Sequence, residues 1–189
     1  MKNFKTRTVY YRRSRSGKTN YRQRLKLLLS KKPRVVVRRS SRFIRAQFVE
    51  FFDVGDKVLV SVDSKALVKV GWKGALNNMP SAYLLGLLFA KKVGNKECVL
   101  DIGLQTSLKG GVIYSFVKGC IDGGLKIPCA ESMFPPEDVI SGKNIADFAK
   151  FLKADKEKFK RQFSKVSERL DPEKIVDHFK EVKQKILGK

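Results

Sequence analysis

Acidic side chains are absent from the first 49 residues of this 189-residue chain, in which Glu50 is the first carboxylate. The same segment holds 17 of the 41 lysines and arginines and carries a charge of +17, against +3 for residues 50–130 and +3 for residues 131–189. Solubility alone does not require this concentration, because clustered like charges repel one another in a compact fold. The pattern indicates a polyanionic partner, which is nucleic acid, an anionic membrane surface or an acidic protein.

Long apolar runs, cysteine pairs and histidine clusters are also lacking. The longest strongly apolar run, residues 83–90, is far shorter than the roughly 20 residues that span a membrane, and no apolar run follows the basic N-terminus. We therefore expect no membrane partner and no export. The three cysteines form no Cys-x-x-Cys pair and the chain has one histidine, so we expect free thiols in the reducing cytoplasm, no metal and no cofactor.

A catalytic constellation is missing as well. Residues 16–19 read SGKT, but a phosphate-binding loop also needs a glycine where this chain has Arg12. Asp101 follows a short apolar strand without a partner acid or base, so we expect it to accept amide protons from the next loop. His178 is expected on the surface of an amphipathic helix. We predict that the protein is not an enzyme; the alternative is an RNA-processing enzyme that uses Asp101.

What the sequence does contain is the pattern of an α/β fold. Residues 1–17 read as a basic arm, and Thr19 or Asn20 can cap a helix that Pro33 ends and that docks by an apolar stripe at Tyr21, Leu25, Leu28 and Leu29. A three-stranded antiparallel meander and a further strand in a mixed sheet, covered by helices, are predicted from RVVVRRS, RFIRAQFVEFF, KVLVSVDS and ECVLDIG. We expect a basic RNA-binding arm and helix at 1–32, an α/β core domain at 33–130 and a helical C-terminal extension at 131–189.

The basic excess extends over the arm, the helix and the first hairpin. The strand period of two places Arg34 and Arg38 on the face opposite Val35 and Val37, so the sheet is also expected to present positive charge. Lysine and arginine release condensed counterions when they neutralise phosphates, which favours nucleic acid as the partner. RNA is preferred over DNA because no zinc finger, zipper or helix-turn-helix is present and a long basic arm suits irregular RNA. A chromatin or membrane-surface protein is the remaining alternative.

Several motifs between about residues 8 and 153 carry a family resemblance. In order, they are GKTNYRQRLKLLLSKKPRVVVRRSSRFIRAQFVE, GWKG, PSAYLLGLL, VLDIGL, LKG, GGLKIPCAESMFP and GKNIADFAKFL. The chain resembles the archaeal and eukaryotic branch of the universal large-subunit ribosomal protein that binds 5S ribosomal RNA. Family members commonly have serine and arginine where this chain has Gly111 and Val112, and the residues at 76–79, LNNM, depart from a Gly-Asn-Thr pattern.

The resemblance implies a structural, non-enzymatic protein of the central protuberance. Its expected partners are 5S rRNA, the large-subunit rRNA and neighbouring ribosomal proteins, including the other 5S-binding protein. The residues expected to contact RNA, by carry-over and from the charge of the arm, are Arg7, Arg12, Arg13, Arg15, Lys18, Tyr21, Arg22, Arg24, Lys26, Arg34, Arg38, Arg39, Arg42, Arg45, Trp72, Lys73, Lys109 and Gly110. Tyr10, Tyr11 and Trp72 are candidates for stacking on bases, with burial in the core as the alternative for Trp72.

Overall fold

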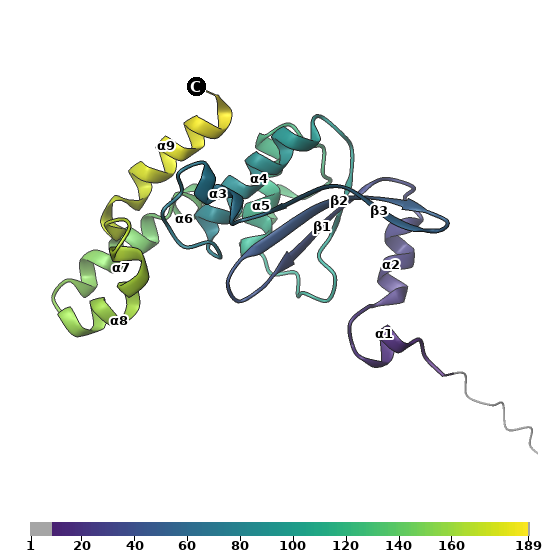
Figure 1. The fold of residues 1–189 in the computed structure, drawn as a ribbon, viewed down its shortest axis with the longest axis horizontal. Helices are drawn as coiled ribbons and strands as arrows, with labels where there is room; N and C mark the ends of the chain where they lie inside the picture. Colours follow the sequence, from purple (N-terminus) through teal and green to yellow (C-terminus); the bar gives the residue numbers. More distant parts are fainter. Residues whose placement is uncertain (1–8, 189) are drawn as a thin grey trace, which may run out of the picture.

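A four-stranded mixed sheet lies at the centre of the computed structural model, which describes residues 9–188 (Figure 1). The strands follow the order β3-β2-β1-β4, with β1 antiparallel to β2, β2 antiparallel to β3, and β4 parallel to β1. Their bounds are Arg34–Arg39 for β1, Ile44–Phe52 for β2, Gly55–Asp63 for β3 and Val99–Asp101 for β4. The predicted α/β class and the antiparallel meander with a further strand are confirmed.

Two apolar helices, α4 (Met79–Val93) and α5 (Val112–Asp122), cover one face of the sheet. The alternation along β1 sends Val35 and Val37 into this core, where both are fully buried. Asn78 begins α4 with a reciprocal capping box, and Pro80 occupies its first turn. The opposite face of the sheet is left for polar and basic side chains.

The C-terminal extension is helical and shares the core. It contains the α-helices α6 (Glu137–Ser141), α7 (Lys143–Leu152), α8 (Lys156–Ser167) and α9 (Ile175–Leu187), with short 3-10 turns at Glu131–Met133 and Pro172–Lys174. Helix α9 packs on α4 and contributes Ile175, Phe179, Val182 and Ile186 to the buried cluster under the sheet. Helices α7 and α8 enclose a smaller cluster around Phe163. The short α3 (Ala66–Lys69) leads from β3 towards Trp72.

The N-terminal helices lie at the opposite end of the molecule from α7 and α8 (Figure 1). They are α1 (Arg12–Arg15) and α2 (Tyr21–Leu28), and the side chain of Asn20 caps α2 as predicted. Two details of the prediction are wrong. Helix α2 ends at Leu28, before Pro33, and none of its residues is buried. Two residues of the expected docking stripe face outward, because Leu25 is 60% and Leu29 is 73% exposed, and Leu28 is only half-buried.

Candidate nucleic-acid interface

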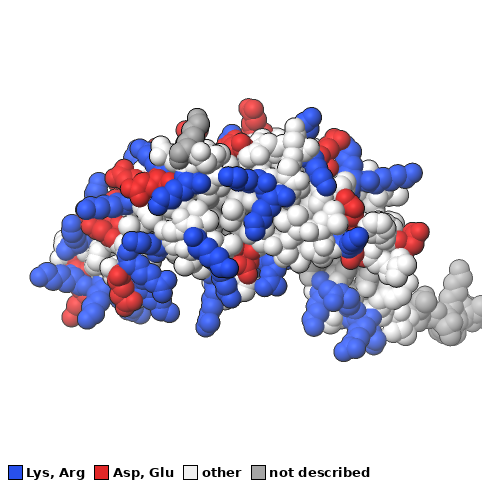
Figure 2. Space-filling model, turned by 45° about the horizontal axis from the view of Figure 1, so that its top comes forward, with Lys and Arg blue, Asp and Glu red and all other residues white. Residues whose placement is uncertain are grey.

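Most of the cations that were expected to contact RNA are accessible. Lys and Arg side chains project beside the N-terminal helices with few carboxylates among them, whereas both signs alternate over the helices at the other end (Figure 2). The exposed members of the expected set are Arg12, Arg13, Arg15, Lys18, Tyr21, Arg22, Lys26, Arg38, Arg39, Arg42, Arg45, Lys73 and Lys109, and Arg24 and Gly110 are half-buried. Arg7 lies outside the described residues.

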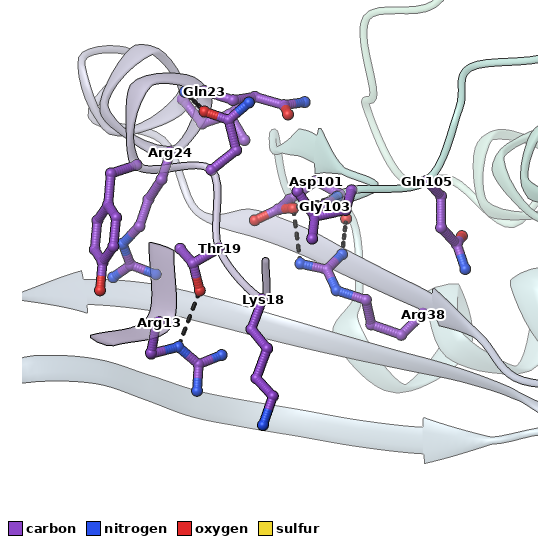
Figure 3. A pocket seen from close by; sticks show the side chains of 13 residues that line it. Arg13, Lys18, Thr19, Gln23, Arg24, Arg38, Asp101, Gly103 and Gln105 are labelled. Carbon is purple, nitrogen blue, oxygen red and sulfur yellow. Dashed lines mark hydrogen bonds and ion pairs between the residues drawn. The ribbon is translucent and has the colours of Figure 1, made fainter. Parts of the chain in front are cut away.

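A cavity of about 590 Å³ separates the N-terminal helices from the loop after β4 (Figure 3). Arg13 and Lys18 approach it from the N-terminal segment, Arg24 from α2 and Arg38 from β1. Arg13 Nε donates to the hydroxyl of Thr19 at 2.9 Å, which orients its guanidinium. Four cations from three segments therefore border one hollow, an arrangement suited to a phosphate group.

A chain of ion pairs includes three of the residues that line this cavity, Arg24, Arg38 and Asp101. Arg34 Nη1 lies 3.0 Å from Asp101 Oδ2, and Arg34 Nη2 lies 2.7 Å from Asp56 Oδ2. The second contact lacks the alignment of a hydrogen bond and is chiefly electrostatic. Arg24 Nη1 approaches Asp56 Oδ2 at 2.9 Å, and Arg38 Nη2 approaches Asp101 Oδ1 at 2.9 Å. Burial raises the pKa of Asp56, but its contacts with Arg24 and Arg34 outweigh burial and hold that pKa below its usual range.

Asp101 serves the loop as predicted. Its Oδ1 accepts the N–H of Gly103 at 2.9 Å, and its backbone carbonyl accepts Arg38 Nη1 at 2.7 Å. Gly103 has a φ of 66° and lies against the Arg38 guanidinium, which leaves no room for a Cβ atom. With its oxygens held by two guanidiniums and an amide, the carboxylate supports the exposed Arg38 side chain.

Two of the expected contact residues are buried. The Arg34 side chain is only 2% exposed: strand alternation placed it on the correct face, but Asp56 and Asp101 enclose it there. Trp72 is 1% exposed, and its indole Nε1 donates to the carbonyl of Ala75 at 3.1 Å. Neither side chain presents a surface to RNA in this structure, and for Trp72 the core alternative is the correct one.

Asparagine and glutamine side chains that sequence reasoning missed hold the basic turn between β1 and β2. Asn77 Oδ1 accepts Arg39 Nε at 2.7 Å, and Asn77 Nδ2 donates to the carbonyls of Ser40 and Ser41 at 2.8 and 3.0 Å. Gln105 Nε2 donates to the carbonyl of Arg39 at 3.0 Å. Asparagine and similar polar residues in a loop indicate a turn in the sequence. Only the three-dimensional structure shows which backbone groups their side chains bind.

The N-terminal half of the chain, which carries this basic surface, matches a known protein family. Residues 2–97, just over half of the chain, match the sequence model of the family described as ribosomal large subunit proteins 60S L5, and 50S L18. The chain belongs to this family. As a member of the L5/L18 family it is a protein of the large ribosomal subunit, and it is associated with rRNA there. The matched residues include the N-terminal arm, α2, the meander and α4, which together supply most of the surface described above.

No group of three or more His, Cys, Asp or Glu side chains within residues 9–188 is arranged to hold a metal ion. Over the same residues, every helix is too short or too polar to cross a lipid bilayer. The family is typically structural and non-enzymatic.

Proposed function

We propose that this protein is the structural component of the large subunit that binds 5S rRNA and helps to attach it to the large rRNA in the central protuberance. The observation that carries this proposal is the convergence of Arg13, Lys18, Arg24 and Arg38 on one cavity at the end of the molecule where the basic excess lies. Phosphate contacts position a protein on RNA without reading its sequence, so recognition depends on the shape of a folded RNA.

In this proposal the three parts of the chain have different tasks. Residues 1–32 enter the RNA, residues 33–130 present the basic hairpin and the loops with Lys73 and Lys109, and residues 131–189 complete the core and face neighbouring proteins, including the other 5S-binding protein. The contact surface consists of the expected contact residues without Arg34 and Trp72. Arg7 belongs to it as an arm residue. The site of action is the cytoplasmic ribosome.

The decisive experiment is crosslinking in cells followed by sequencing of the attached RNA. We expect chiefly 5S rRNA, with large-subunit rRNA in second place. A filter-binding comparison of 5S rRNA with tRNA and with duplex DNA at physiological salt gives the solution counterpart. Equal binding to all three nucleic acids contradicts a specific 5S role and favours a general polyanion binder.

Enzymatic use of Asp101 in an RNA-processing reaction is disfavoured by its surroundings. The carboxylate contacts Arg34, Arg38 and the amide of Gly103, so its oxygens are occupied by structural partners. A cleaved RNA product that disappears in Asp101→Asn is the result that would favour the enzyme.

A further inference from the structure

Five charges alternate in sign along the ion-pair chain, in the order Arg24, Asp56, Arg34, Asp101 and Arg38. They come from α2, the start of β3, β1, the end of β4 and again β1. The middle arginine is buried, and the two end arginines both border the cavity below α2. The carboxylates therefore lie between groups that the proposed function assigns to RNA.

Helix α2 has little else to hold it. It buries none of its residues, and Leu27 and Leu28 are only partly covered. Among residues 9–188, the contact between Arg24 and Asp56 is the one ion pair that joins α2 to the sheet. A surface helix of eight residues is marginal on propensity alone, so its position depends on such contacts.

We propose that Asp56 is a positioning residue for RNA binding, which holds α2 against the sheet so that the cations of α2 and β1 engage one RNA together. The inference rests on the proposed function. Asp56 does not contact RNA in this scheme; it acts through Arg24, with Arg34 and Asp101 as its fixed support.

The geometry leaves Arg24 able to do both tasks. Its guanidinium has five N–H donors, and one nitrogen, Nη1, makes the contact with Asp56. The Arg24 side chain is 33% exposed and lines the cavity. A phosphate can therefore bind the remaining donors while the carboxylate keeps the side chain in place. Holding the group before RNA arrives removes part of the ordering cost of binding.

The positioning role and the net charge of the protein predict opposite effects of Asp56→Asn on the affinity for RNA. Removing a carboxylate from a protein of charge +23 strengthens its general attraction to RNA. Asp56→Asn is instead expected to weaken 5S rRNA binding by about tenfold, because Arg24 and the buried Arg34 each lose a charged partner. The matched control is Asp53→Asn, which makes the same charge change at an exposed turn residue of the same hairpin and is expected to leave binding unchanged or slightly tighter.

Asp56→Glu, Arg24→Ala and the double variant Arg24→Ala with Asp56→Asn show whether Asp56 acts through Arg24. Asp56→Glu keeps the charge and is expected to restore part of the affinity. In the Arg24→Ala background, Asp56→Asn is expected to weaken binding by less than about twofold, because the two residues work as a pair. Two results overturn the proposal. One is that the two substitutions reduce the affinity by independent factors that multiply in the double variant. The other is that Asp56→Asn binds 5S rRNA as tightly as the wild type or more tightly.

Hydrogen exchange of the RNA-free protein gives a readout that is independent of affinity. The amides of residues 24–29 are expected to exchange faster in Asp56→Asn than in the wild type and in Asp53→Asn, while those of α4 and α5 stay protected. Unchanged exchange in α2 overturns the proposal. Should Asp56→Asn not fold, Arg24→Gln leaves the pairs of buried Arg34 intact and must produce the same faster exchange.

The two proposals fail differently. If the wild-type protein binds 5S rRNA no better than tRNA, the 5S role is contradicted. The hydrogen-exchange experiment then still decides whether Asp56 holds α2. Specific wild-type binding together with full binding by Asp56→Asn removes only the positioning role.

Discussion

The imidazole of His178 stacks on the indole of Trp72, with ring centroids 5.2 Å apart and 17° between the ring planes. His178 Nε2 also accepts the backbone N–H of Lys73 at 3.1 Å. A residue of the last helix thus fixes the loop that carries Lys73, an exposed cation of the proposed surface. The sequence predicted a surface histidine, but this side chain is 11% exposed.

We expect this contact to respond to acid. Burial lowers the pKa of His178, and Lys73 and Lys185 act in the same direction, while Glu181 opposes them. Because the unfolded state takes up the proton first, the stability from the neutral ring is present above about pH 6.5 and is lost as the pH falls through the lowered pKa of the folded state. Trp72 is the single tryptophan, so its emission between pH 7.5 and 5 reports the change.

His178→Phe is the matched variant, since it keeps an aromatic ring and removes the titrating nitrogen. We expect its Trp72 emission to be independent of pH over the same range. An equal pH response in His178→Phe assigns the change to another group and contradicts the role of the imidazole.

Exposed cations of α2 are expected to contribute to the salt dependence of RNA binding. Each neutralised phosphate adds about 0.7 to the slope of log affinity against log salt for a single strand, so Arg22→Ala with Lys26→Ala is expected to lower that slope by about 1.4. Filter binding from 50 to 300 mM salt measures it. The control, Lys92→Ala with Lys180→Ala, removes two exposed charges from α4 and α9 and is expected to leave the slope unchanged. Equal slopes in both double variants would remove α2 from the RNA interface.

The crossing of α4 and α5 requires glycine on both helices. A Cβ atom on Gly86 would collide with the backbone of Phe116, and one on Gly119 would collide with the backbone of Tyr83. Gly86→Ala and Gly119→Ala are each expected to lower the free energy of unfolding by about 1–3 kcal/mol through overpacking. Urea unfolding measures the loss, with Lys92→Ala as an exposed α4 control expected to change it by less than about 0.5 kcal/mol.

Thiol reactivity is expected to follow burial. Burial raises the pKa of Cys98 to about 11 and raises that of the fully buried Cys120 well above its usual range. The pKa of Cys129 is also raised, but this thiol is only half-buried. At pH 8 an aromatic disulfide reagent should therefore modify Cys129 first, and Cys98 and Cys120 only when the protein unfolds. Cys129→Ser should abolish the fast phase; a fast phase that persists would show that the buried thiols are accessible.

The sequence predicted those features that depend on neighbours along the chain. The alternation of residues along β1 predicted which side chains lie on each face, Asn20 predicted the beginning of α2, and the lack of acidic residues predicted the basic end of the molecule. The sequence did not predict features that depend on contacts between residues far apart in the chain. Arg34 is paired with Asp101, 67 positions later, and the stack of Trp72 with His178 joins a central loop to the last helix. The stripe on α2 has helical spacing, but Leu25 and Leu29 are exposed, whereas Arg24 of the same helix is paired with Asp56 of β3.

The positions of Asp56 and Asp101 in the chain determine when α2 can be held in place during translation. Helix α2 leaves the translating ribosome before any of its carboxylate partners, and its support is complete only when Asp56 and then Asp101 have emerged and β4 has paired with β1. Helix α2 precedes all four strands in the chain, yet its support is in place only after β4 has been made. Until then Arg24, Arg34 and Arg38 lack the carboxylates that hold them in the folded protein.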